Sequence, residues 1–157
     1  GDHRDLHLSI RRQRQMCIRD RVYPMLILML PFELSLFATL IISFLLGISV
    51  DGFSNTFGLH ASSAMLIGYL RPTVLRYIKP RDGYDSSLLP SIQDMGIPWF
   101  LGYSSLFLLI HHAWFFTFEI LRFDLTLLIL AKTFFSLIFS LLLIILFQFI
   151  FYKASKK

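Results

Sequence analysis

Apolar residues in this chain occur in long blocks, not at the spacing of a single helix face or strand face. Five blocks are present, at residues 22–32, 34–50, 57–70, 99–118 and 125–151. A helix needs roughly 20 apolar residues to cross the hydrocarbon core of a membrane. The last two blocks reach that length, the second can just cross, the third is short, and the first spans only about half the core. The pattern predicts an all-α, polytopic membrane helix bundle with five segments, the first of them incomplete.

Composition supports a membrane protein. The 157 residues are 55% hydrophobic and 16% charged, whereas a soluble domain carries about 25% charged residues. We therefore expect one transmembrane domain at residues 22–157, with a hydrophilic loop at residues 71–98 rich in proline and glycine. The single cysteine, Cys17, excludes an internal disulfide and a paired-cysteine metal or redox site.

The distribution of Lys and Arg predicts the orientation in the membrane. The 71–98 loop holds four such residues and the C-terminal tail three, whereas the turn at 51–56 holds none and the turn at 119–124 holds one. Because basic loops stay in the cytoplasm, we expect the 71–98 loop and the C-terminus to be cytoplasmic. We expect these basic residues to contact anionic membrane lipid. The sequence contains no motif typical of nucleic-acid recognition, so nucleic acid is not predicted as a partner.

Residues 1–21 conflict with this orientation, because their six arginines would lie outside if the first block ends a spanning helix. Three interpretations remain: a cytoplasmic tail before a re-entrant segment, a signal-peptide-like region, or a foreign tail. The stretch Gln15–Arg21 resembles translated sequencing-adaptor sequence, and a cleavage site of small residues is missing. We favour the third interpretation, and we expect residues 1–21 to be a basic tail that is non-native or disordered.

Polar residues collect toward the outer side of this topology. Asp51 ends the second block, His60 begins the third, and His111 and His112 lie in the outer half of the fourth, which Glu119 closes. Ionisable groups inside a membrane usually have buried partners, so the cluster is a candidate for binding a ligand or a partner helix. Alternatively, the two acids end helices in water and the histidines form neutral hydrogen bonds between helices.

Neither catalysis, a metal nor a cofactor is predicted for this cluster. His111 and His112 are adjacent, so their side chains point about 100° apart on a helix, whereas ligand pairs prefer a spacing of three or four residues. Helix packing is the clearer pattern. Small residues four positions apart, which let helices approach closely in lipid, occur at Ser43 and Gly47, at Ala64 and Gly68, and at Ser136 and Ser140.

From about Tyr23 onward the chain resembles MreD, the rod-shape-determining membrane protein family of bacteria. The resemblance rests on the stretches at residues 30–33, 45–61, 70–76 and 80–84 and on the His111–His112 pair. It implies a six-helix bundle similar to the substrate-binding component of energy-coupling-factor vitamin transporters, in the bacterial inner membrane with both termini cytoplasmic. The family's first helix and half of its second would fall where residues 1–22 stand.

The resemblance implies a non-enzymatic scaffold of the cell-elongation complex, involved in rod-shape determination and lateral cell-wall (peptidoglycan) synthesis. Its expected partners are MreC-like and MreB-like proteins, a RodA-like glycosyltransferase and the elongation-specific penicillin-binding protein. Asp51, Gly58, His60 and Arg71 match recurrent family positions and are, with the two histidines, candidates for structural or partner-binding roles. The alternatives are a vitamin-binding transporter subunit and, third, an intramembrane hydrolase.

Overall fold

The chain folds into helices joined by turns, without a strand among the residues that the structure describes. This computed structural model describes residues 22–81, 83–85, 88–120 and 126–155, with side chains up to residue 150. A first helical segment covers residues 22–28. The other helices are α2 (Leu36–Ser54), α3 (Leu59–Tyr77), the short α4 (Ile92–Met95), α5 (Ile97–Ile120) and α6 (Thr126–Ser155). The predicted foreign tail, residues 1–21, lies outside the described residues.

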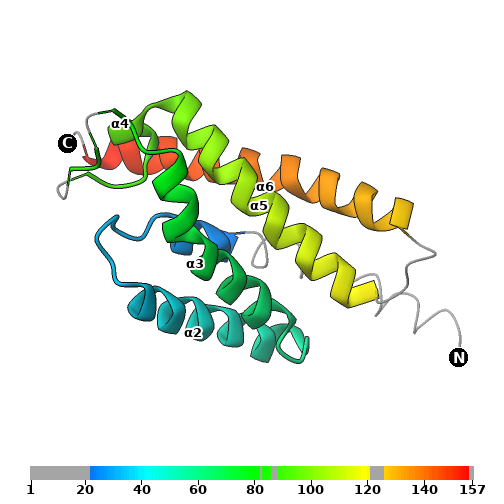
Figure 1. Ribbon diagram of the computed structural model, residues 1–157. Helices are drawn as coiled ribbons and strands as arrows, with labels where there is room; N and C mark the ends of the chain where they lie inside the picture. Colours follow the sequence, from blue (N-terminus) through cyan, green and yellow to red (C-terminus); the bar gives the residue numbers. More distant parts are fainter. Residues whose placement is uncertain (1–21, 82, 86–87, 121–125, 156–157) are drawn as a thin grey trace, which may run out of the picture.

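The helices form two antiparallel pairs, with α2 packed on α3 and α5 packed on α6. The pairs meet where α3 packs on α5 (Figure 1). The starts of α2 and α5 and the ends of α3 and α6 therefore share one end of the bundle, as the alternating topology predicts. The all-helical fold class is confirmed, although the number of membrane crossings remains a prediction.

The first segment lies at the centre of the bundle. Ile27 and Leu28 are fully buried, and both belong to a core cluster with Ile67 of α3 and Phe107 of α5. Met25 packs in a second cluster that α5 and α6 complete. The block predicted to be half a span is therefore a core element that joins the two helix pairs.

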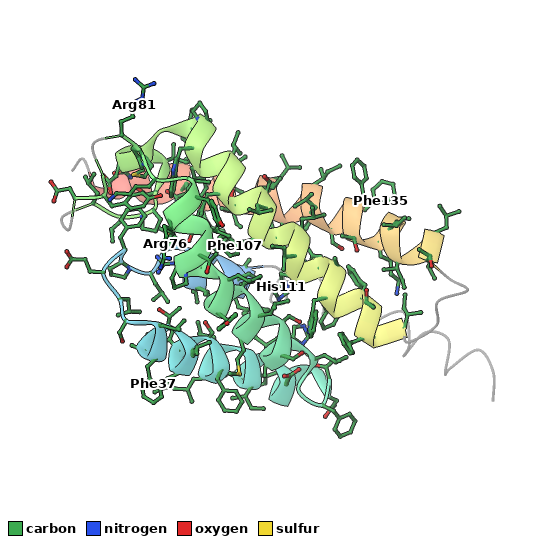
Figure 2. The ribbon with its side chains drawn as sticks, in the orientation of Figure 1. Phe37, Arg76, Arg81, Phe107, His111 and Phe135 are labelled. Atoms are coloured by element: carbon green, nitrogen blue, oxygen red, sulfur yellow. The ribbon has the colours of Figure 1, made fainter. Side chains whose placement is uncertain are left out.

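Two helices, α2 and residues Thr126–Ile150 of α6, are long and apolar enough to cross a membrane. Their outward faces carry large apolar side chains. Phe37 on α2 is 74% exposed and Phe135 on α6 is 70% exposed, and both point away from the bundle in Figure 2. Phe107 of α5, by contrast, points into the bundle. An all-helical protein with two candidate spans and apolar outer faces is thus the observed architecture.

The predicted loop at residues 71–98 is wrong at its beginning and its end. Helix α3 continues to Tyr77 with Pro72 inside it, and α5 begins at Ile97. Proline inside a helix costs one backbone hydrogen bond and opposes the preceding turn. The helix continues because the side chains of Arg71 and Leu75 are buried on its inner face and tie this turn to the bundle. These tertiary contacts outweigh the local preference.

The small residues of α2 and α3 bring these two helices into close contact. A Cβ atom built on Gly47 would lie 2.4 Å from Cα of Ala61 and 2.9 Å from the His60 carbonyl oxygen. At Gly68 the nearest atom is the Ser43 hydroxyl oxygen, at 2.6 Å. The predicted packing role of these pairs is therefore confirmed for α2 and α3.

We expect Gly47→Ala to lower the stability of the purified protein by about 1–3 kcal/mol, because the new methyl group meets backbone that cannot rotate away. The matched control is Gly52→Ala in the same helix, where nothing lies within 4 Å of the new atom. That control should be neutral or slightly stabilising. Thermal unfolding in detergent measures both variants, and equal melting temperatures would contradict the close approach.

Candidate functional site

Asp51 is the centre of a buried hydrogen-bond cluster at the corner between α2 and α3. Its side chain is nearly inaccessible, with the residue 5% exposed. One carboxylate oxygen, Oδ1, accepts hydrogen bonds from the Thr56 hydroxyl at 2.6 Å and the His60 backbone N–H at 3.1 Å. The other, Oδ2, accepts from the Ala61 backbone N–H at 2.9 Å. Asp51 therefore caps the start of α3 from the last turn of α2.

The cap corrects one of the two interpretations drawn from the sequence. The sequence is compatible with Asp51 as a helix-end residue in water, but in the structure Asp51 is buried and bonded to the next helix. Glu119 differs, since it lies near the surface and its carboxylate is 3.4 Å from the ammonium of Lys132. The two acids at the predicted outer ends thus have different surroundings.

Gly58 makes this corner possible. It precedes the first residue of α3 and has φ of +87°, a left-handed conformation that side chains rarely adopt. Asn55, which ends α2, is also left-handed, with φ of 55°. Phe57 also has a positive φ, of 32°. These three residues reverse the chain within a few positions, so that Asp51 reaches the first N–H groups of α3. Gly58 therefore has a backbone role.

His60 and His111 are linked through Tyr23. The Nδ1 atom of His60 lies 3.1 Å from Oδ1 of Asp51. The Tyr23 hydroxyl donates to the backbone carbonyl of His60 at 3.3 Å and is hydrogen-bonded to Nε2 of His111. The first segment thereby connects α3 to α5.

His112 connects α5 to α6, the other helix of its own pair. Its Nε2 lies 3.0 Å from the Ser140 hydroxyl of α6, and its ring meets that of His111 edge to face, with centroids 5.2 Å apart. The adjacent histidines therefore point in different directions, as their spacing predicts. One holds α5 to the first segment and the other holds α5 to α6.

Together, these groups form what we call the polar chain: Asp51, Thr56, His60, Tyr23, His111, His112 and Ser140. It contains four of the predicted site residues and runs from α2 to α6. Sequence reasoning missed Tyr23 and Thr56 and assigned Ser140 to packing alone. Tyr23 could have been identified from its place at the start of an apolar block, because a tyrosine hydroxyl that becomes buried usually finds a hydrogen-bond partner.

Arg71 lies apart from the polar chain, toward the other end of α3. It is 2% exposed. Its Nε donates to the Tyr103 hydroxyl at 3.1 Å, and its two terminal nitrogens donate to the backbone carbonyls of Pro31 and Leu30. Tyr103 in turn donates to the Leu28 carbonyl at 3.0 Å. Arg71 thus fastens the end of the first segment to α3 and α5.

The geometry favours a structural role for the predicted residues. In the polar chain, donors face acceptors on neighbouring helices, which fixes the relative positions of those helices. Within the described ranges, no group of three or more His, Cys, Asp or Glu side chains is placed to hold a metal ion. Comparison of the chain with protein-family models, curated proteins and solved structures finds no match.

Proposed function

We propose that this chain is a multi-pass protein of the bacterial inner membrane, with a cytoplasmic C-terminus, and a non-enzymatic scaffold of the cell-elongation complex. In this role it contributes to rod-shape determination and regulates lateral cell-wall synthesis. The two candidate spans and the exposed phenylalanines of α2 and α6 support the membrane placement. These faces would be unfavourable in water but match lipid tails.

One observation carries the scaffold proposal: the residues behind the MreD resemblance build the helix framework. Asp51 and Gly58 form the corner between α2 and α3. His60 belongs to the polar chain, and Arg71 fastens the central segment. These residues serve shape rather than chemistry, as expected of a protein that works by positioning partners.

The proposed partners are those that the resemblance implies: MreC-like and MreB-like proteins, a RodA-like glycosyltransferase and an elongation-specific penicillin-binding protein. The transporter alternative required the outer polar cluster to line a pocket. In the described residues, however, the side chains of Asp51, His60 and His111 are buried and hydrogen-bonded within the bundle. The geometry therefore favours the scaffold.

A single complementation experiment tests function and placement. The full chain, fused at its C-terminus to green fluorescent protein, is expressed in rod-shaped bacteria depleted of their own MreD. We expect membrane-localised fluorescence, which requires a cytoplasmic C-terminus, and recovery of rod shape in cells that otherwise become round.

A Glu119→Gln variant, altered at an exposed ion pair, serves as the matched control and should restore rods equally well. Round cells with full membrane fluorescence would contradict the shape function. Rod-shaped cells that hold the fusion in the membrane without fluorescence would contradict the cytoplasmic C-terminus.

A further inference from the structure

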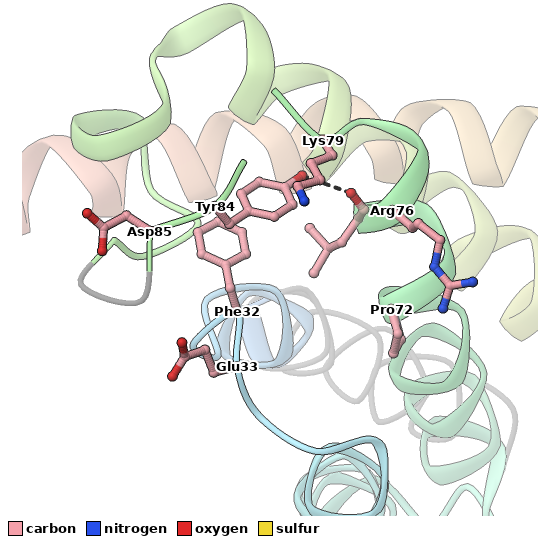
Figure 3. A pocket seen from close by; sticks show the side chains of 8 residues that line it. Phe32, Glu33, Pro72, Arg76, Lys79, Tyr84 and Asp85 are labelled. Atoms are coloured by element: carbon pink, nitrogen blue, oxygen red, sulfur yellow. Dashed lines mark hydrogen bonds between the residues drawn. The ribbon is translucent and has the colours of Figure 1, made fainter. Parts of the chain in front are cut away.

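A pocket of about 310 Å³ opens beside the C-terminal half of α3, away from the polar chain. Its floor is apolar and aromatic. The Phe32 and Tyr84 rings stack with centroids 4.2 Å apart and planes 15° apart, and Pro72 and Leu75 of α3 complete the lining. The Tyr84 hydroxyl donates to the Leu75 carbonyl at 3.0 Å, which holds the floor against the helix (Figure 3).

Burial raises the pKa of Tyr84 to about 12. The phenol therefore remains a neutral hydrogen-bond donor to the Leu75 carbonyl at physiological pH. A neutral, fixed ring also keeps an electron-rich face available to a cation. The bond from Tyr84 to α3 is thus retained at neutral pH.

The rim of the pocket carries charges of both signs on different elements. Arg76 belongs to α3 and Lys79 follows its end, whereas Glu33 and Asp85 come from two loops. In Figure 3 the two acids lie on one side of the stacked rings and the bases on the side of α3. Among the described residues, neither Arg76 nor Lys79 has an ion-pair partner. The pocket therefore carries two positive charges on one side and two negative charges on the other, so that its formal net charge is zero.

The pocket is lined by residues just before α2 and in the last turns of α3. Figure 1 shows the start of α2 and the end of α3 at the same end of the bundle. In the proposed orientation this end faces the cytoplasm. Tyr77, in the last turn of α3, is 86% exposed, and exposed tyrosines are typical of the membrane interface. The pocket is thus at the level of lipid headgroups.

We propose that this pocket binds the headgroup of a zwitterionic phospholipid with a primary amine, of the phosphatidylethanolamine class. The phosphate is held by Lys79 and Arg76 through charge-assisted hydrogen bonds. The ammonium lies toward Glu33 and Asp85, beside the faces of the stacked rings. This inference rests on the membrane placement in the proposed function, but not on the role in cell shape.

The mixed rim distinguishes this lipid from its competitors. A purely anionic headgroup would gain from the two bases but would meet two carboxylates without a compensating cation. A choline headgroup carries the cation but has no N–H to donate to the carboxylates. Of the three headgroups compared, ethanolamine combines a phosphate, a positive charge and N–H donors in one short headgroup.

Native mass spectrometry of the purified full chain tests the proposal. Phosphatidylethanolamine, phosphatidylglycerol and phosphatidylcholine with identical acyl chains are added in equal amounts, and the bound lipid is measured. We expect about two- to fivefold more phosphatidylethanolamine than either competitor, the range that one or two solvent-accessible charge contacts supply. Glycerophosphoethanolamine, which lacks the acyl chains, should displace the lipid poorly.

Variants assign the contacts. Glu33→Gln should remove the preference for phosphatidylethanolamine over phosphatidylglycerol, whereas Lys79→Gln should weaken the binding of both. Arg81→Gln, which removes an exposed base outside the pocket lining, is the matched control and should change neither. These three side chains are exposed, so unchanged melting temperatures should accompany the binding changes.

Equal binding of the three lipids, a preference for phosphatidylglycerol, or identical binding by the Glu33 and Arg81 variants would overturn the proposal. If glycerophosphoethanolamine displaces bound phosphatidylethanolamine as effectively as the lipid itself does, the occupant of the pocket is not a membrane lipid. The assay uses purified protein, so it is separate from the complementation experiment. Failure to restore rods would leave the lipid result intact, and the reverse also holds.

Discussion

Replacing Arg71 by Met is expected to destabilise the protein by about 2–4 kcal/mol. Methionine fills much of the space and removes a buried charge, which by itself favours folding. It also leaves the Leu30 carbonyl and the Tyr103 hydroxyl without the donor that Arg71 provides. Loss of the donor costs about 1–3 kcal/mol at a buried acceptor such as the Tyr103 hydroxyl, and the part-buried Leu30 carbonyl adds a smaller cost. The loss of donors therefore outweighs the relief of desolvation.

The matched control for Arg71→Met is Arg76→Met, five positions further along the same helix and exposed. This variant should remain within about 0.5 kcal/mol of the parent. Arg71→Lys should lie between the two, because an ammonium cannot reproduce the planar fork that reaches three oxygens. Thermal unfolding in detergent measures the series. Equal melting temperatures for the Met variants at positions 71 and 76 would show that the three hydrogen bonds contribute little.

Asp51→Ala is the second large effect, expected to cost about 2–4 kcal/mol. The change removes the acceptor for the first N–H groups of α3 and for the Thr56 hydroxyl in a buried corner. Loss of a single helix cap costs about 0.5–2 kcal/mol, and burial adds the cost of donors left without water. We therefore expect α3 to lose its first turn and the corner to loosen.

Asp51→Asn should recover only part of this loss. An amide has one oxygen, and keeping it toward Thr56 and His60 places its NH₂ group against the Ala61 N–H, so that two donors face each other. The matched control is Glu119→Gln, a similar change at a partly exposed acid, which should be nearly neutral. Hydrogen exchange at residues 59–61 provides the readout. Unchanged protection in Asp51→Ala would argue against the cap.

Much of the architecture could be predicted from the order of apolar blocks. The block at 99–118 lies within α5, and the block at 34–50 lies within α2 except for its first two residues. Long apolar runs have no stable alternative in a membrane to helices that satisfy their own backbone. The predicted ends of the helices agree less well with the structure. The extension of α3 through Pro72 depends on the burial of Arg71 and Leu75, which local sequence cannot reveal.

The sequence predicted most residues of the candidate site but not the contacts between them. Spacing alone showed that His111 and His112 point in different directions. It could not show that Tyr23, about ninety positions earlier, bonds to His111, because contacts between distant residues depend on how the helices pack. Asp51 shows the same limit, since its environment depends on the reversal at Asn55 and Gly58.

By itself, the sequence determined the all-helical class, the apolar character and the residues able to carry charge or a hydrogen bond. These properties follow from composition and local order. Only the tertiary structure decided that the first block is the core of the bundle, that Asp51 and Arg71 are buried anchors, and that four charged side chains from three elements surround one pocket. Which side chains are buried, and which groups they contact, depends on packing between residues that are far apart in the sequence.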